Sequence, residues 1–422
     1  MNKVGLLLIF LIILTSSVFA QQEPTKLSYK LYGFVRTDFC YDSRQGASAN
    51  EGLFYLYPLD IKPDDSDAHK DLNATPSSGF YAFNTRFGLD ITGLKVFDAD
   101  VLARVEADFA GYSNSSTLLR IRRAFMKMQW ENSSLLIGQE WHPMFGGVVP
   151  SVLSLNTGAP FNPFNRSPQI NYSYKFGNVT LIAAALWQFQ YTSIGPEGKK
   201  PNYQRNSNVP EFSAAIDFKR NGIVFGAMAD YLTLQPRTQF ISENKTYKVT
   251  EQHLTSFSYG AYVGYSHNLF SVNIKSVLGE NMANLSMPGG FGVSKIDPVT
   301  GQQEYTNFKH STSWLNFVYG KKYQGSLFAG YTKNLGSQDK LALTDANNLA
   351  STVVYGDGMN MNELYRFCGI FSYNVPNFTI GLEYEFTTSV YGEGARNVTD
   401  GLFEKTHDVS GHRILGVISY NF

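Results

Sequence analysis

Connections of alternating length constrain the fold of this chain more than any other feature. Segments with an apolar side chain at every second position are joined in turn by a short turn and by a long polar loop. Successive side chains of a β-strand point to opposite faces, so each segment predicts a strand with one apolar and one polar face. A soluble sandwich or barrel does not show such strict alternation. The pattern is typical of a barrel with tight turns at one end and long loops at the other.

About sixteen strands are predicted, each close to or above the roughly 9–11 residues that a tilted strand needs to cross a bilayer. They span residues 30–41, 80–92, 97–112, 117–131, 133–143, 168–176, 178–192, 209–219, 222–234, 252–267, 269–286, 306–319, 323–336, 360–374, 377–391 and 410–422. Short turns are expected near residues 93–96, 131–132, 177, 220–221, 268, 320–322 and 376, and long loops at 42–78, 144–167, 193–208, 235–251, 287–305, 337–359 and 392–409. Only one outer connection, residues 113–116, is short. The predicted fold class is all-β, a transmembrane antiparallel β-barrel.

The best strands show the two faces clearly. In residues 30–41, Leu31, Val35, Phe39 and Tyr41 share the apolar face. Residues 80–92 place Tyr81, Phe83, Phe87, Leu89 and Ile91 opposite Asn84, Arg86 and Asp90, and residues 97–112 place Val101, Ala103, Val105, Ala107 and Phe109 opposite Asp100, Arg104, Glu106 and Asp108. In residues 117–131 charge falls on both faces, which predicts a bulge or a covered outer face.

The two ends of the chain indicate export to an outer membrane. Tyr420 and the terminal Phe422 lie on the apolar face of the last predicted strand, as in the assembly signal of outer-membrane barrels. Residues 1–20 combine a basic start, a short apolar run and small residues up to Ala20, which predicts a signal peptide. The predicted organisation is therefore a signal peptide at 1–20, a short leader at 21–27 and the barrel at 28–422.

Composition and motifs exclude several classes of function. The net charge is zero, so no basic excess indicates nucleic-acid binding. The two cysteines, Cys40 and Cys368, fall in strands that are not predicted to pair, and free thiols are expected. No catalytic, phosphate-binding or metal-binding motif is present, so we expect neither an enzyme nor a cofactor. An aspartate-rich stretch around His69 lacks EF-hand spacing, and Ca²⁺ binding by loop 42–78 stays open.

Two segments resemble a known family. Residues 141–147 begin with an aromatic residue and continue to paired glycines, like the third loop of porins. Residues 120–125 and 136–139 resemble the fourth and fifth strands of DcaP-like and related Bacteroidota porins. The chain thus resembles the Gram-negative outer-membrane general porins of the sixteen-stranded, trimeric type.

This resemblance implies a third loop folded into the lumen as a constriction. The residues expected there are His142, Pro143, Phe145, Gly146, Gly147, Phe161, Phe164 and Arg166. It also implies a homotrimer, passive diffusion of small polar solutes, contact with outer-membrane lipid and lipopolysaccharide, and folding by the barrel-assembly machinery. The loop contains no acidic residue, which places the cation preference of enterobacterial porins in doubt.

Charged residues on the polar strand faces are the candidates for lining the pore. They are Arg36, Arg86, Arg104, Arg120, Arg122, Arg366, Arg413, Glu106, Asp108, Glu383 and Glu385. Guanidinium groups favour anions, which predicts a weakly anion-preferring pore. The alternative is that the acidic residues neutralise the arginines as ion pairs that brace the wall. Two further functions stay open, a substrate-specific uptake channel and a barrel that serves as a surface adhesin or receptor.

Overall fold

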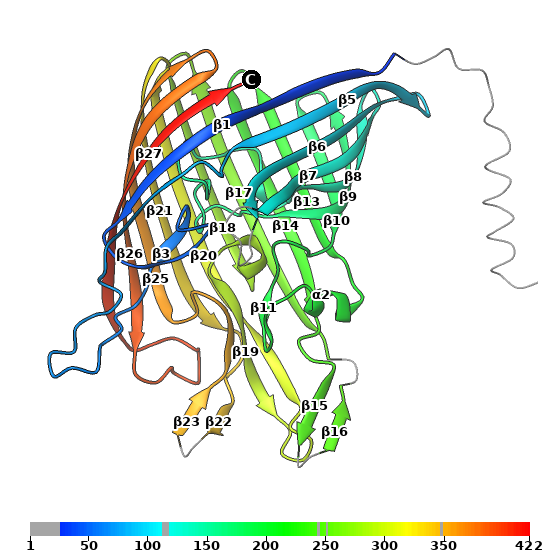
Figure 1. Cartoon of the computed structure of the whole chain (residues 1–422). Coiled ribbons are helices and arrows are strands. Elements are labelled where there is room, and N and C mark those ends of the chain that lie inside the picture. Colours follow the sequence, from blue (N-terminus) through cyan, green and yellow to red (C-terminus); the bar gives the residue numbers. More distant parts are fainter. Residues whose placement is uncertain (1–25, 112–117, 243–244, 250–251, 347–348) are drawn as a thin grey trace, which may run out of the picture.

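The structure is a computed structural model that describes residues 26–111, 118–242, 245–249, 252–346 and 349–422 (Figure 1). It is nearly all β, with 66% of the chain in strands and 3% in helices, and its strands form a closed antiparallel barrel of 16 strands. Within the described residues, no helix is both long enough and apolar enough to cross a bilayer. The predicted signal peptide, most of the leader and the short connection at residues 113–116 lie outside the described residues.

Each barrel strand pairs with its neighbours in chain order. The strands are β1 (Ser28–Asp42), β4 (Ser77–Tyr81) continued by β5 (Arg86–Val96), β6 (Ala99–Gly111), β7 (Leu118–Gln129), β8 (Ser133–Trp141), β9 (Arg166–Phe176), β10 (Val179–Leu186), β13 (Glu211–Arg220), β14 (Ile223–Leu234), β17 (Leu254–His267), β18 (Phe270–Glu280), β20 (Gln303–Gly320), β21 (Tyr323–Ser337), β25 (Met361–Val375), β26 (Phe378–Glu393) and β27 (Lys405–Asn421). The first and last strands close the barrel. Gly33 and Phe422 exchange two backbone hydrogen bonds there, of 3.1 and 3.0 Å.

Smaller elements lie in the long connections, at the end of the barrel opposite the C-terminus or inside it (Figure 1). They are β2 (Gly46–Ala49), β3 (Phe54–Pro58), η1 (Pro143–Phe145), β11 (Ile194–Gly195), β12 (Gly198–Lys199), α2 (Asn202–Ser207), β15 (Gln239–Ser242), β16 (Lys245–Lys248), η2 (Met282–Leu285), β19 (Gly289–Ile296), β22 (Leu343–Ala346), β23 (Leu349–Thr352) and β24 (Val354–Asp357). The hairpins β15–β16 and β22–β23 project farthest from the barrel.

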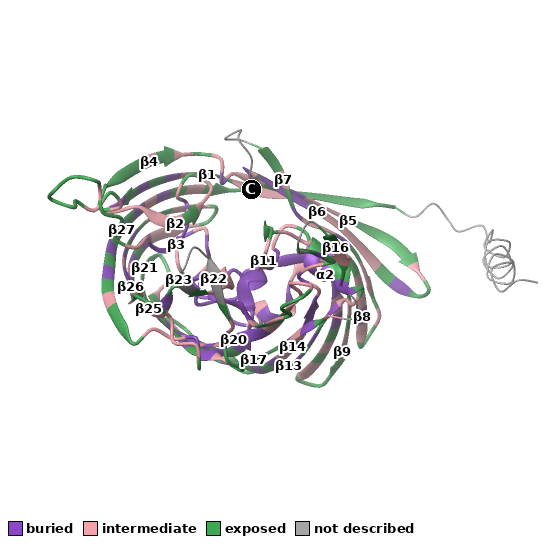
Figure 2. Cartoon of the chain, turned by 90° about the horizontal axis from the view of Figure 1, so that it is seen from below, coloured by how far each residue is buried: buried purple, intermediate pink, exposed green. Residues whose placement is uncertain are grey.

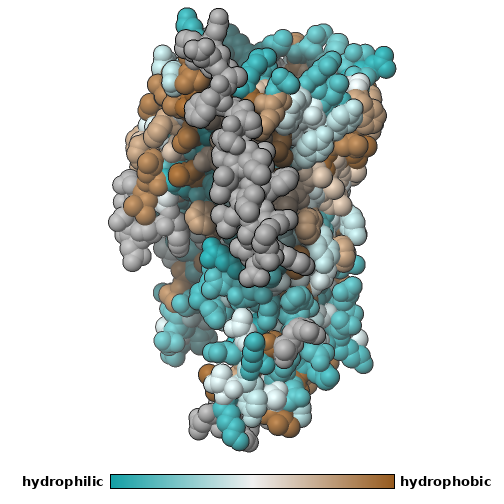
Figure 3. Space-filling model, turned by 90° about the vertical axis from the view of Figure 1, so that its right-hand side faces the viewer, coloured by the Kyte–Doolittle hydropathy of each residue, from teal (hydrophilic) through white to brown (hydrophobic). Residues whose placement is uncertain are grey.

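The outward face is apolar, as the alternation predicted. Leu31 is 63% exposed, and Val35 and Tyr420 are also exposed although they sit in paired strands. Exposed apolar side chains gather over the part of the barrel nearer the short turns, whereas the loop end is mainly hydrophilic (Figure 3). Such a belt suits a surface surrounded by hydrocarbon.

The first hairpin differs from the prediction in its turn and in one face. The turn lies at Phe97 and Asp98, both with positive φ, and the predicted turn near Gly93 is instead an irregularity in the ladder. Residues 82–85 leave the ladder between β4 and β5, which shifts the alternation of the side chains. Tyr81 and Phe83 therefore pack inward, and the prediction that they face outward is wrong.

Other boundaries moved because the chain turns into the barrel earlier than its apolar pattern indicated. The strands predicted at 178–192 and 269–286 end at Leu186 and Glu280. The segment predicted as a loop at 287–305 contains β19, which pairs with an extension of β20. The bulge predicted for residues 117–131 is confirmed by register shifts between β6 and β7.

Candidate functional site

Residues 142–165, which connect β8 to β9, fold into the barrel and are called here the lumen loop. Its side chains include several that are fully buried, with Met144 and Phe161 at 0% exposure and Phe164 at 2%. The view along the barrel axis shows buried segments inside the ring of strands (Figure 2). The expectation of a third loop in the lumen is confirmed.

Wall residues on distant strands hold the middle of the lumen loop. The Glu383 carboxylate on β26 accepts hydrogen bonds from the backbone N–H groups of Leu153 and Ser154. Arg36 on β1 donates to the Leu153 carbonyl at 2.6 Å. The side chain of Asn316 on β20 accepts from the Ser151 N–H at 2.9 Å. Because backbone groups are bound directly, the path of the loop across the lumen is fixed.

Lys275 on β18 joins both limbs of the lumen loop. Its ammonium donates to the Phe145 carbonyl and, at 2.8 Å, to the Asn162 side-chain oxygen. The rings of Phe145, Tyr262 and Trp314 surround the ammonium at 5.6, 5.8 and 5.5 Å. The side chain is 0% exposed, and no carboxylate bonds to it among the described residues. In the sequence, Lys275 is marked only as a lone lysine on an inward strand face.

The paired glycines predicted for the constriction lie against an aromatic ring. A Cβ added to Gly146 would be 2.9 Å from Tyr262 Cε1, and one added to Gly147 would be 2.8 Å from Tyr262 Oη. Gly146 also has a positive φ of 67°. Glycine is needed here because the loop backbone approaches the ring closely.

A second segment, β2 and β3, also enters the barrel, although loop 42–78 was predicted to be a polar loop. Tyr55 and Tyr57 of β3 are buried, and Asn156 of the lumen loop donates to the Tyr55 carbonyl at 2.6 Å. Burial raises the pKa of Tyr57 well above its usual value, and Asp357 next to it acts in the same direction. The apolar run at residues 53–57 was the signal that could have revealed this insertion.

Two of the predicted pore-lining arginines are covered by these inserted segments. Arg366 is 1% exposed, lies 3.1 Å from Glu385, and donates to the carbonyl of Ala159 at 3.0 Å and to that of Leu56. Arg413 is also buried and pairs with Asp42 at 2.9 Å. Arg366 thus holds loop segments in place, Arg413 lies 5.2 Å from the Tyr55 ring of β3, and neither faces open lumen.

Most arginines of β5, β6 and β7 stay partly exposed, with Arg122 as the exception. Arg86, Arg104 and Arg120 have 22%, 22% and 18% of the side chain exposed. Arg104 pairs with a carboxylate of β5, Asp90, at 2.5 Å. Rings lie beneath two of these guanidinium groups, since Arg86 stands 4.9 Å from the Phe34 ring and Arg104 5.3 Å from the Tyr32 ring. This wall is charged and accessible.

Ion pairs connect the charges of this wall without balancing them. Arg122, itself buried, binds Glu106 at 3.0 Å and Asp108 at 2.8 Å, and Arg120 binds Asp108 at 2.9 Å. The ion-paired groups are Arg86, Arg120, Arg122 and Arg123 with Glu106, Asp108 and Glu140, and separately Arg104 with Asp90. Five arginines minus four carboxylates leave one positive charge.

Arg166, predicted in the constriction, adds a further positive charge beside this wall. The guanidinium lies 4.6 Å from the ring of Trp141, 5.1 Å from that of Phe164 and 5.4 Å from that of Tyr191. It donates to the Tyr191 hydroxyl at 2.6 Å. Within the described part of the chain it has no ion pair with a carboxylate. Aromatic faces therefore replace a counter-ion around this buried cation.

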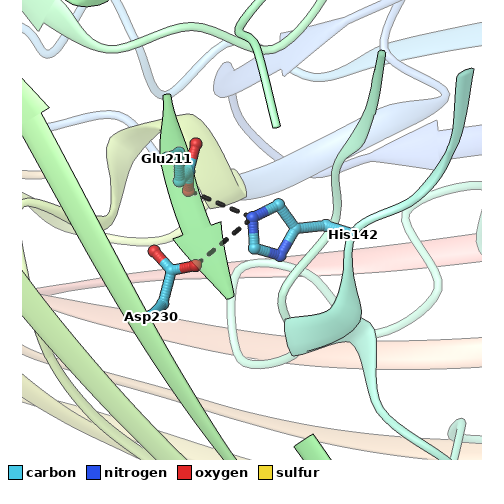
Figure 4. A group of neighbouring side chains, drawn as sticks. All are labelled: His142, Glu211 and Asp230. Atoms are coloured by element: carbon cyan, nitrogen blue, oxygen red, sulfur yellow. Dashed lines mark hydrogen bonds and ion pairs between the residues drawn. The ribbon is translucent and has the colours of Figure 1, made fainter. Parts of the chain in front are cut away.

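A buried polar group fixes the root of the lumen loop (Figure 4). His142 Nε2 lies 3.0 Å from Glu211 Oε1 on β13 and 3.6 Å from Asp230 Oδ1 on β14. His142 Nδ1 accepts the Met144 N–H at 3.1 Å, and Asn284 of η2 donates to Glu211 Oε1 at 2.9 Å. Burial lowers the pKa of His142, against the smaller opposite effect of Asp230. Sequence reasoning placed His142 in the constriction but missed both carboxylates.

These three residues have metal-ligand chemistry, since their ligand atoms lie within 4.8 Å of one another. A neutral histidine that binds a metal through Nε2 carries its proton on Nδ1, where it usually donates a hydrogen bond. Here Nδ1 accepts a hydrogen bond from the Met144 N–H. The observed geometry therefore fits a proton on Nε2 and not a metal ion. A second group, Cys368, Glu383 and Glu385, has both carboxylates engaged by Arg366 and the lumen loop.

No protein-family model and no curated protein matches this chain. Solved structures match over nearly the full length. The outer membrane channel DcaP of Acinetobacter baumannii is 17% identical, with a TM-score of 0.64 over 95% of this chain and 99% of that chain. In-vitro folded OmpT, an outer membrane protein of Vibrio cholerae, is 11% identical, with a TM-score of 0.54 over 96% and 100% of the two chains.

An anion-selective porin from Comamonas acidovorans is 9% identical, with a TM-score of 0.55 over 94% of this chain and 100% of that chain. At such low identities the likenesses establish the fold. The predicted sixteen-stranded barrel of the porin type is thereby confirmed.

Proposed function

We propose that this chain is an outer-membrane porin, a water-filled channel through which small hydrophilic solutes diffuse. One observation carries the proposal: a closed barrel with an apolar outer belt has charged groups on its inner wall and a loop fixed across its lumen. Sixteen strands enclose more space than their own side chains fill. The matched outer-membrane channels and porins support this function.

A weak preference for anions follows from the same wall. The ion-paired groups of β5 to β8 carry one positive charge in excess, and Arg166 adds another. Most of these arginines are paired, so the preference is expected to be small. The two alternatives drawn from the sequence thus combine, because the ion pairs brace the wall and the excess charge sets the selectivity. The matched porin from Comamonas acidovorans is described as anion-selective.

The remaining parts of the proposal concern export and assembly. Residues 1–20 act as the signal peptide, residues 21–27 as a leader, and Tyr420 and Phe422 as the signal for the barrel-assembly machinery. The barrel is embedded in outer-membrane lipid and lipopolysaccharide as a homotrimer, and a trimer form is described for the matched OmpT of Vibrio cholerae. We assign it no catalytic activity.

Conductance of the detergent-folded protein in a planar bilayer tests the proposal. A KCl gradient across the bilayer gives the selectivity from the reversal potential. Ohmic steps that close in thirds at high voltage are expected from an open trimer, and a small reversal potential of the sign for anions is expected from the wall. Folded protein that gives no steps would contradict a diffusion channel.

A substrate-specific uptake channel is the second candidate. The observation that favours it is the additional narrowing by β2 and β3, which join the lumen loop inside the barrel. Current that a particular solute blocks in a saturable way would establish this function in place of general diffusion.

A further inference from the structure

The root of the lumen loop is held by three buried side chains, His142, Glu211 and Asp230, called here the root group. Their side chains are 0%, 0% and 5% exposed. They come from three separate elements, since His142 caps η1, Glu211 begins β13 and Asp230 lies in β14. Any charge on the root group is therefore shielded from bulk water.

The hydrogen bonds of the imidazole define its protonation. Nδ1 accepts the Met144 N–H at 3.1 Å, so Nδ1 carries no proton. The proton of the neutral ring is then on Nε2, which donates to Glu211 Oε1 at 3.0 Å. A second ring proton would face the Met144 N–H and break the turn that η1 makes. The histidine is accordingly neutral and cannot balance a carboxylate.

No positive charge therefore neutralises the two carboxyl groups of Glu211 and Asp230 within the root group. Among the described residues, the only charged groups that face these carboxyl groups belong to the root group itself. Their polar neighbours are Asn284 of η2 and Ser213 of β13. Within the described part of the chain, no N–H or O–H group of another residue donates to Glu211 Oε2 or Asp230 Oδ1. Two adjacent buried carboxylates without a cation cannot both be ionised.

We propose that Glu211 and Asp230 share one proton, and that this shared proton keeps the root of the lumen loop docked on the wall, so that the loop undocks as the pH rises. The proposal rests on the proposed function only for its effect on conductance. The step is a simple ionisation, in which a carboxyl O–H bond breaks and the proton passes to water or hydroxide.

The sign and size follow from proton linkage. The docked loop holds one proton on the carboxyl pair. In the undocked state water reaches both groups, which then ionise with ordinary pKa values of about 3.9 and 4.3 and hold no proton at neutral pH. Above about pH 7.5, where the released His142 imidazole with its ordinary pKa of about 6.5 is also neutral, the ratio of docked to undocked loop therefore falls about tenfold for each pH unit, until the docked state also loses the proton.

Infrared difference spectroscopy tests the shared proton without any need for conduction. At neutral pH the folded protein should show the C=O stretch of a buried protonated carboxylic acid. Difference spectra of the native protein against Glu211→Gln and against Asp230→Asn should each show the loss of one such band. Asp90→Asn is the matched control, since it removes a wall carboxylate paired with Arg104, and should leave the band. Absence of the band, or its persistence in both variants, would overturn the proposal.

Single-channel recordings between about pH 7.5 and pH 9 test the effect on the loop. Current fluctuations of the native channel should become about tenfold more frequent per pH unit. Asp230→Asn should make them independent of pH, and Asp90→Asn should not. If Zn²⁺ or a chelator changes the frequency of the current fluctuations at constant pH, the root group binds a metal ion and the shared-proton proposal is wrong. If the protein does not conduct at all, the proposed function fails, and the infrared band still decides the proton.

Discussion

Replacing Lys275 with methionine is the sharpest test of how the lumen loop is held. Methionine keeps the apolar stem of the side chain but removes the ammonium that joins Phe145 and Asn162. Asn162 keeps one donor, Trp314 Nε1, at 3.2 Å. The Phe145 carbonyl loses its bond from Lys275. The variant should therefore loosen the limb of the loop that follows His142 more than the limb near Asn162.

The size of the effect is a difference between two opposing contributions. Each hydrogen bond from a charged donor stabilises by about 1.5–3 kcal/mol, so two bonds amount to about 3–6 kcal/mol. Against this, burying an ammonium with no carboxylate partner costs several kcal/mol, which the variant recovers. We expect a net loss of about 1–3 kcal/mol in loop docking, or a roughly 5–150-fold rise in the undocked fraction.

Single-channel noise and limited proteolysis of the folded protein measure this fraction. Lys275→Met should increase both the current noise and the rate of cleavage within residues 142–165. Lys309→Met is the matched control, because that lysine is 43% exposed and its ion pair with Glu280 is long, at 3.7 Å. Unchanged noise and cleavage in Lys275→Met, or equal changes in both variants, would refute the account of Lys275 as the clamp of the loop.

Three further predictions concern other parts of the barrel. Deletion of Phe422 removes its two backbone hydrogen bonds with Gly33, which extend the pairing of the first and last strands, and the yield of folded barrel in a refolding assay should fall; full yield would contradict a role of Phe422 in closing the barrel. Gly147→Ala forces Tyr262 to move and should destabilise by about 1–3 kcal/mol in urea unfolding, whereas Gly325→Ala, with open space around it, should not. Arg86→Gln removes one positive charge from the exposed wall, so the reversal potential in a KCl gradient should shift toward cation preference, and an unshifted value would argue against the charge count.

The sequence predicted the barrel because alternation is a local property of each strand. Leu31 and Val35 reveal their face through their immediate neighbours, and hydrocarbon on one side leaves no other arrangement. The same reasoning failed for Tyr81 and Phe83, since the break in the ladder at residues 82–85 shifts the alternation, and the apolar and polar residues around it still alternate in the sequence. The face of a residue is predictable only while the ladder is continuous.

The contacts of the lumen loop could not be predicted from the sequence alone. Glu211 and Lys275 look like ordinary polar residues on inward faces, and their role appears only when His142 or Asn162 reaches them from a loop far away in the chain. Burial of Arg366 under the loop depends on the same kind of long-range contact. The position of a residue along a strand predicts which face of the sheet it lies on. Whether that residue lines the open lumen depends on which loop segments pack over it.

The sequence distance between the lumen loop and its supports has a consequence for biogenesis. Leu153 binds Glu383, 230 residues later, and Ala159 binds Arg366, 207 residues later. Contacts this remote form only after the intervening chain has been ordered. The lumen loop is synthesised early, but Arg366 and Glu383, which bind its backbone, lie on strands that are among the last to be synthesised. The root group and Lys275 precede those strands in the chain and can hold the ends of the loop before them, so it is the middle of the loop that reaches its final position only as the last strands close the barrel.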